Sequence, residues 1–210
     1  METLKATPVI PLIQAEDPAI ATKTAIALKA GGLTTLEVVW RTDAAMECME
    51  AIINEVEGVT VGAGTVLTAE QADVAAKRGA QFIVAPGLNQ GVVETSKSHG
   101  LDIYAGVATA SEVQLAWNMD LRTVKFFPAG LVGGVPMLKA LSSVFRGMSF
   151  MPTGGVSASN LKDFLSVPSV VACGGSWLTP KTEIEAGNFD EITKLASEAL
   201  AIARDAKSEN

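Results

Sequence analysis

The amino-acid sequence repeats one pattern eight times: a short, strongly apolar segment followed by a longer segment with helical character. The eight apolar segments are residues 9–13, 34–40, 60–66, 81–87, 102–108, 123–128, 149–155 and 170–177. Near-continuous apolar runs of this length are typical of strands that are buried on both faces of a parallel sheet. The centres of successive segments lie 21 to 26 residues apart.

Eight strand–helix units at nearly constant spacing predict an α/β protein with a (β/α)8 TIM barrel. We expect one compact barrel domain over residues 1–210, with residues 1–7 and 206–210 at its periphery, because no linker or low-complexity tract interrupts the chain. The chain is short for a barrel, so its helices and loops must be short. The competing architecture is an open doubly wound sheet, which usually has fewer units.

Helix-capping signals support the alternation. Residues 17–32 begin with a capping aspartate and a proline and stop at two glycines. Further helix starts are predicted at Thr68 with Gln71 and at Thr109 with Glu112, which fit capping boxes, and at Ser157 for residues 157–165. The last helix is predicted over residues 188–207, with a frayed tail over residues 208–210.

Composition excludes several classes of function. The net charge of −7 argues against a nucleic acid or an anionic membrane as the main partner. A single histidine, His99, excludes a histidine-rich metal site, and Cys48 and Cys173 have no C-x-x-C spacing. We expect both thiols to be core residues and His99 to lie near a helix C-terminus. No apolar leader or membrane span is visible, so the chain is expected to be cytoplasmic. No cofactor is expected.

Charged residues interrupt two of the predicted buried strands. Glu37 and Arg41 share one face of the second segment, and Lys125 stands between Val124 and Phe126 in the sixth. Active sites of barrels lie at the carboxyl ends of the strands, so an amine, a carboxylate and a guanidinium are expected to share one lumen.

Two interpretations of these charges stay open. Apolar walls and a nearby guanidinium favour a neutral Lys125 amine, which could attack a ketone, with Glu37 as general acid and base. Alternatively, Lys125 and Glu37 form a purely structural ion pair. Arg41 either grips a carboxylate with two hydrogen bonds or makes a surface pair.

Glycine-rich turns are predicted after the seventh and eighth strands. They comprise Thr153, Gly154 and Gly155, and Gly174, Gly175 and Ser176. Backbone amides at such turns bind phosphate, and these two loops often do so in barrels. The alternative is that the glycines only allow tight turns. The run GAGTV, residues 62–66, lacks the spacing of a dinucleotide site.

Six motifs in register, LEVVWRT, VGAGTV, APG, VKFFPA, PTGGV and GGSWL, resemble the class I aldolases of 2-keto-3-deoxy-6-phosphogluconate (KDPG). The resemblance runs from about residue 8 to about residue 200, and the same family covers activity on 2-keto-4-hydroxyglutarate (KHG). It implies a metal-independent homotrimer of barrels in the Entner–Doudoroff pathway, which cleaves KDPG to pyruvate and glyceraldehyde 3-phosphate. Cleavage of KHG would give pyruvate and glyoxylate.

The resemblance also implies roles for individual residues. Lys125 would form the Schiff base and Glu37 would transfer protons. The substrate-binding set would be Arg41 and Thr65 at the pyruvate carboxylate, Pro86 and Phe127 lining the pocket, and Thr153, Gly154, Gly155, Gly174, Gly175 and Ser176 at the phosphate. The chain departs from the family at Val39, often a threonine, and at Gly130, often acidic. A sugar-phosphate isomerase or epimerase, and a non-catalytic sugar-phosphate binding protein, are the rival functions.

Overall fold

Every apolar segment of the sequence contains a strand in the computed structural model, which describes residues 7–208. The strands are β1 (Val9–Ile13), β2 (Thr35–Val39), β3 (Thr60–Gly64), β4 (Phe82–Val84), β5 (Asp102–Tyr104), β6 (Gly106–Val107), β7 (Thr123–Phe126), β8 (Ser149–Pro152) and β9 (Cys173–Gly175). The fifth segment is divided at Ala105, so it supplies both β5 and β6. The predicted positions of the strands are therefore confirmed.

All of the strand pairs between these elements are parallel. One sheet has the order β5-β4-β3-β2-β1-β9 and forms a half-barrel, and a second has the order β6-β7-β8. Residues 102–107 contribute to both sheets, and the amide of Lys125 donates to the carbonyl of Ala105 at 2.9 Å. An isolated parallel bridge joins Thr153 to Gly174 on the other side of the second sheet.

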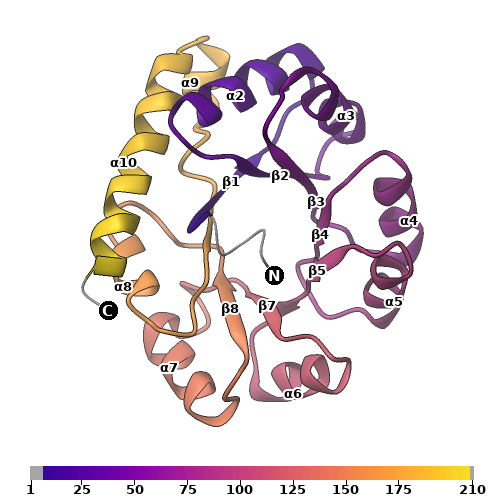
Figure 1. Ribbon diagram of the computed structural model, residues 1–210, viewed down its shortest axis with the longest axis vertical. Coiled ribbons are helices and arrows are strands. Elements are labelled where there is room, and N and C mark those ends of the chain that lie inside the picture. The colour runs from indigo at the N-terminus through magenta and orange to yellow at the C-terminus, as the bar shows by residue number, and fades with distance from the viewer. Residues whose placement is uncertain (1–6, 209–210) are drawn as a thin grey trace.

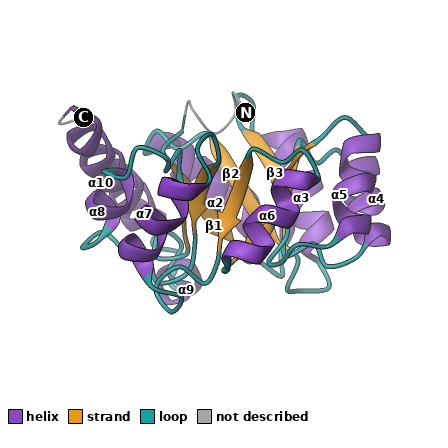
Figure 2. Ribbon diagram, turned by 90° about the horizontal axis from the view of Figure 1, so that it is seen from below, coloured by secondary structure: helices purple, strands orange, loops and turns teal. Residues whose placement is uncertain are grey.

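Helices surround the strands on the outside (Figures 1 and 2). They are α2 (Pro18–Ala30), α3 (Ala45–Glu55), α4 (Ala69–Lys77), α5 (Gln90–Ser98), α6 (Ala110–Asn118), α7 (Gly134–Val144), α8 (Leu161–Leu165), α9 (Lys181–Glu185) and α10 (Phe189–Ser208). They cover the strands, which are buried on both faces and need an apolar cover, except for α9, which has no buried residue. The architecture is a single α/β domain with parallel strands inside.

Capping explains where several helices begin. The Asp17 side chain accepts from the amide of Ala19 at the start of α2, and both predicted capping boxes are present, at α4 and α6. The prediction that Ser157 caps a helix is wrong. Residue 160 is the cap of α8, and its side-chain oxygen instead accepts from the amide of Ser157, which places residues 157–160 in turns.

Apolar side chains fill the space on both faces of the strands. The large core lies between the strands and the helices. A smaller cluster on the inner side consists of Ile10, Phe82, Val84, Tyr104, Met151 and Ala172. The expectation that residues 7 and 206 are peripheral is corrected here. The Thr7 hydroxyl is buried and lies 3.0 Å from the hydroxyl of Thr35, and Ala206, a residue of α10, is buried in the core.

The residues predicted to be structural occupy structural positions. Cys48 and Cys173 are free and buried, and burial raises the pKa of each thiol. His99 is the C-cap of α5, and its Nε2 lies 2.9 Å from Oδ1 of Asp73. Helix α10 continues through Ser208, one residue beyond its predicted end, while residues 209 and 210 lie outside the described part. Within residues 7–208, no helix is long and apolar enough to span a bilayer.

Candidate active site

Lys125 is the centre of the site, and its side chain is only 2% exposed. In strand β7, Lys125 is the register partner of Gly106 on β6 and of Met151 on β8. Its Nζ lies 3.6 Å from Oε1 of Glu37 on β2, a strand of the other sheet. The charged residue in the apolar strand thus has a partner that is 88 residues away in sequence, which compensates part of its burial.

The Glu37 carboxylate is fully buried, and neither oxygen makes a hydrogen bond within residues 7–208. An ion pair at 3.6 Å leaves most of the acceptor capacity of a carboxylate unused. Buried polar groups normally have hydrogen-bond partners, so both oxygens of Glu37 keep the capacity to accept a hydrogen bond from a ligand hydroxyl. Such a carboxylate is suited to accept and return a proton.

Gly64 on β3 provides the room for this carboxylate. A Cβ built at position 64 would collide with Oε1, Cγ and Cδ of Glu37. Sequence analysis did not identify Gly64 as a site residue, although the signal was present as the alternating glycines of GAGTV. Only the folded sheet shows the register, in which Val39 pairs with Gly64, two residues beyond the pair of Glu37 and Gly62.

An aromatic ring lies beside the amine. The Nζ atom of Lys125 is 5.1 Å from the ring centroid of Phe127, which comes two residues later on the same face. The same ring also lies against Gly154, where a Cβ would approach two of its ring carbons at 3.3 Å. Phe127 therefore lies between the lysine and the glycine turn after β8.

Arg41 and Thr65 meet at the ends of β2 and β3. Nε of Arg41 donates to Oγ1 of Thr65 at 3.3 Å, and the arginine side chain is otherwise exposed. Thr65 has a φ of 59°, a rare left-handed conformation for a β-branched residue. Strained residues of this kind concentrate at functional sites. The pair offers a guanidinium and a hydroxyl next to each other, which suits a carboxylate ligand.

The two predicted glycine turns differ from each other. Gly154 and Gly155 have φ values of 86° and 81°, and no hydrogen bond within residues 7–208 uses their amides, so this turn is as predicted. The prediction of a turn at residues 174 and 175 is wrong, because both belong to β9 and pair with β1. Their lack of a side chain instead admits the Thr153 hydroxyl and the Trp177 ring.

A cavity of about 420 Å³ opens at the carboxyl ends of β1, β2 and β9. Its lining includes Arg41 and Ser176, with Leu12, Gln14 and Val39 between them. Two predicted site residues that are far apart in sequence therefore share one opening. The short helices that follow the glycine segments, α8 and α9, begin at residues 161 and 181 and so do not start at these turns.

Pro86 is the predicted site residue with the weakest link to this centre. It follows β4 and is half-buried, and its carbonyl packs against Gly106, which has no side chain. The contact places Pro86 beside the strand that neighbours Lys125, since Gly106 is the register partner of Lys125.

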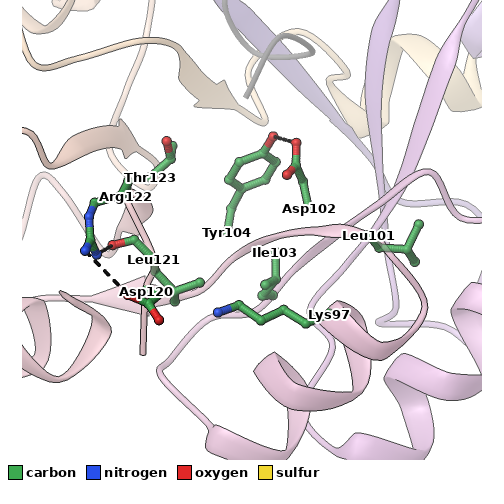
Figure 3. A pocket seen from close by; sticks show the side chains of 9 residues that line it. All are labelled: Lys97, Leu101, Asp102, Ile103, Tyr104, Asp120, Leu121, Arg122 and Thr123. Atoms are coloured by element: carbon green, nitrogen blue, oxygen red, sulfur yellow. Dashed lines mark hydrogen bonds and ion pairs between the residues drawn. The ribbon is translucent and has the colours of Figure 1, made fainter. Parts of the chain in front are cut away.

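A second, smaller cavity of about 230 Å³ lies at the opposite ends of β5 and β7 (Figure 3). Its lining includes Tyr104, whose hydroxyl donates to Oδ2 of Asp102 at 3.3 Å, and Arg122, whose Nη2 lies 3.6 Å from Oδ1 of Asp120. No predicted site residue lines this cavity. It is therefore separate from the candidate active site.

Comparisons with known proteins agree on one family. Residues 1–195 match the family model described as KDPG and KHG aldolase. The chain is 43% identical over 202 residues to the 2-dehydro-3-deoxy-phosphogluconate aldolase of Treponema pallidum, covering 96% of this chain and 95% of that protein. It is 42% identical over 197 residues to the KHG/KDPG aldolase of Escherichia coli K12, covering 94% and 92%.

A solved structure is also similar over nearly the whole chain. The KDPG aldolase of Legionella pneumophila, with pyruvate captured at low pH as a covalent carbinolamine intermediate, superposes with a TM-score of 0.91. It is 38% identical in sequence, and the match covers 94% of this chain and 96% of that one.

Proposed function

Because the chain belongs to the family of KDPG and KHG aldolases, we propose that it cleaves KDPG to pyruvate and glyceraldehyde 3-phosphate through a Schiff base on Lys125. The observation that carries the mechanism is the buried pair of Lys125 and Glu37, 3.6 Å apart, with both carboxylate oxygens free of hydrogen bonds. A purely structural ion pair would be expected to satisfy those oxygens.

The proposed reaction begins at the ketone carbon of the substrate. Glu37 takes a proton from Lys125, and the neutral amine attacks carbon 2 to form a carbinolamine. Glu37 returns that proton to the hydroxyl of the carbinolamine, which leaves as water, and the nitrogen lone pair forms the iminium. Glu37 then removes the proton of the hydroxyl on carbon 4, the bond between carbons 3 and 4 breaks, and its electron pair moves into the iminium to form an enamine.

The second half of the reaction releases pyruvate. The aldehyde formed at carbon 4 leaves as glyceraldehyde 3-phosphate. Glu37 returns its proton to carbon 3 of the enamine, and water hydrolyses the resulting iminium to pyruvate and free Lys125. One carboxylate beside one amine is therefore sufficient for each proton transfer, and no redox change occurs.

Binding residues are proposed at the two ends of the substrate. Arg41 and Thr65 would hold the pyruvate carboxylate through charge-assisted hydrogen bonds, with Pro86 and Phe127 as walls. The phosphate would lie against the free amides of Gly154 and Gly155 and the hydroxyl of Ser176. Thr153 and the strand glycines Gly174 and Gly175 would shape this end through their close packing.

The same residues suit a second substrate. KHG carries its carboxylate and ketone as KDPG does, so Lys125, Glu37 and Arg41 would act on it unchanged. The E. coli relative is named for both activities, which supports cleavage of KHG to pyruvate and glyoxylate as a further reaction.

We extend the proposal to the assembly. The two sheets, linked through residues 102–107 and through Thr153 and Gly174, would close into a (β/α)8 barrel that forms the whole domain. Metal-independent catalysis, a homotrimer and a place in the cytoplasm are proposed from the family resemblance.

Reductive trapping tests the mechanism. The protein is treated with borohydride with and without pyruvate, and its peptides are then mass-mapped. A reduced pyruvate adduct on Lys125 is expected, and the Lys125→Arg variant should be inactive, because a guanidinium stays protonated and is a poor nucleophile. Lys125→Met serves as a second variant, since the methionine side chain fits the buried space of the lysine, whereas the guanidinium of arginine is larger.

An unmodified Lys125 in wild-type protein that binds pyruvate would overturn the Schiff base. Turnover of a phosphosugar that survives Lys125→Met would instead favour an isomerase or epimerase. Binding of sugar phosphates without any turnover would favour a non-catalytic binding protein.

A further inference from the structure

The cavity of about 420 Å³ is lined by one residue from each proposed end of the substrate site, Arg41 and Ser176. Arg41 follows β2 and Ser176 follows β9, and β1 lies between these two strands in the sheet. Neighbouring strands are about 4.8 Å apart, so the cavity crosses roughly two strand spacings. In the proposed reaction carbon 4 lies at Glu37 on β2 and the phosphate lies at Ser176 after β9, so the end of β1 stands between these two points.

The end of β1 presents Leu12 and then Gln14 to this cavity, because alternate residues of a strand share a face. Leu12 is the register partner of Glu37. Continuing that register by two residues places Gln14 beside Val39, one level nearer the mouth than the catalytic carboxylate. Leu12 and Val39 are apolar and buried, whereas the Gln14 side chain is exposed in the cavity.

Two hydroxyl groups that line the cavity beside Gln14 already bond within the protein. The hydroxyl of Thr42 donates to the carbonyl of Ala15 at 2.7 Å, and that of Thr179 donates to the carbonyl of Leu12 at 2.6 Å. Asp17 caps α2. Within residues 7–208, the structure records no hydrogen bond to the side-chain amide of Gln14. A neutral amide is both donor and acceptor, and so it matches a hydroxyl better than a charged group does.

We propose that Gln14 is a specificity-determining residue that hydrogen-bonds the hydroxyl on carbon 5 of the substrate. The inference rests on the proposed function. The hydroxyl on carbon 4 must lie at Glu37 for the bond to break. Carbon 5 is the next atom toward the phosphate, and Gln14 is the next residue toward the mouth that shares the face of Leu12. Val39, the neighbour of Gln14 on β2, offers only an apolar side chain.

The aldol addition of pyruvate tests this contact with two matched aldehydes. Carbon 2 of glyceraldehyde 3-phosphate becomes carbon 5 of KDPG, and 3-oxopropyl phosphate has the same length but lacks that hydroxyl. The ratio of kcat/KM for the two aldehydes is measured in wild type and in Gln14→Leu. We expect wild type to prefer the hydroxylated aldehyde and the variant to lower the ratio about three- to tenfold, as for one neutral hydrogen bond.

The matched control is Gln90→Leu, which removes an exposed glutamine that pairs with Glu94 at the start of α5. Its ratio should equal that of wild type. Borohydride trapping of pyruvate is measured in every variant. It should equal that of wild type, because Gln14 does not contact the pyruvate half of the substrate in this proposal. An unchanged ratio in Gln14→Leu with normal trapping overturns the role of Gln14 alone. Absence of trapping in wild type overturns the proposed function itself.

Discussion

Glu37 occupies the space in which a side chain at Gly64 would stand. The carboxylate on β2 lies against the bare α-carbon of the residue on β3, and a Cβ there would meet Oε1, Cγ and Cδ of the glutamate. Gly64 is buried and lies in a regular strand, so it is needed for this close approach rather than for an unusual φ. The position of the proposed proton-transfer group thus depends on the absence of a side chain on the next strand.

Gly64→Ala is therefore expected to inactivate the enzyme through Glu37. The added methyl group must push the carboxylate away from Lys125, and misplacing a catalytic group by about 1 Å can cost roughly a hundredfold in rate. The measurement is kcat for KDPG cleavage, with circular dichroism as a check of the fold. Gly91→Ala is the control, because a Cβ there meets only Asn89 and Ala69 at 3.3 and 3.4 Å on the exterior. Wild-type kcat in Gly64→Ala would show that the carboxylate does not depend on this contact.

The buried pair of Lys125 and Glu37 should be visible in stability. Lys125→Met leaves a fully buried carboxylate without its counter-charge, and breaking such a pair costs about 3–5 kcal/mol. The double variant with Glu37→Gln removes the uncompensated charge and should recover much of that loss. Urea unfolding of wild type, both single variants and the double variant gives the coupling energy. Additive effects would mean that the two charges do not interact in the folded protein.

Glu37→Gln also has a kinetic consequence. The amide cannot accept and return a proton, so kcat should fall by roughly two to four orders of magnitude, the usual contribution of a general acid or base. The iminium itself can still form slowly, so borohydride trapping of pyruvate on Lys125 should persist. A variant with wild-type kcat would assign the proton transfers to water or to another group.

Arg41 and Thr65 are expected to contribute unequally to pyruvate binding. Arg41→Lys loses the planar two-pronged contact and should raise KM for pyruvate roughly tenfold to a hundredfold. Thr65→Val keeps the β-branched shape but removes one neutral hydroxyl, so its effect should be about three- to tenfold. KM is measured in the addition direction, with the exposed Arg146→Lys as control. If KM is unchanged in both variants, the carboxylate binds elsewhere.

The capping box of α6 should make stability depend on pH. Burial tends to raise the pKa of Glu112, but hydrogen bonds from the amides of Ala108 and Thr109 and the Thr109 hydroxyl outweigh it and lower the pKa below its ordinary 4.5. A lowered pKa in the folded state means that the contribution is complete above pH 4.5 and is lost as the pH falls through the folded-state pKa.

Glu112→Ala should therefore cost about 1 kcal/mol of unfolding free energy at pH 7 and clearly less at pH 3. The comparison is Gln71→Ala in α4, which removes the equivalent partner of Thr68 from a capping box without a titrating group. Its cost should be the same at both values of pH. Equal pH dependence in the two variants would mean that the Glu112 charge does not stabilise α6.

Most of the secondary structure could be predicted because its causes are local. The apolar segments are long enough to mark each strand, and Asp17, Thr68 and Thr109 cap their helices through contacts within three residues. The wrong prediction at Ser157 also concerns a local signal, but there the sequence offers two candidates. Two hydrogen-bonding side chains, Ser157 and Asn160, compete for one helix start, and the sequence does not show which of them the turn will favour.

The alternation of residues along β2 and β7 also determined which charged side chains could face one another. Period two shows which residues share a face with Glu37 and with Lys125, and the barrel prediction supplies the expectation that both faces point inward. The 3.6 Å contact agrees with that expectation. The sequence likewise placed glycines at the turn after β8, where positive φ values are required.

Only the tertiary structure decided the relationships that cross between strands. The register of β1, β2 and β3 sets Gly64 beside the glutamate and Gln14 beside Val39, and register depends on how whole strands pair. The glycines of β9 have a packing role because Thr153 and Trp177 fold back onto them. Sequence determined the elements and their inner faces through short-range physics, while the fit of side chains into the space left by distant glycines required the assembled sheet.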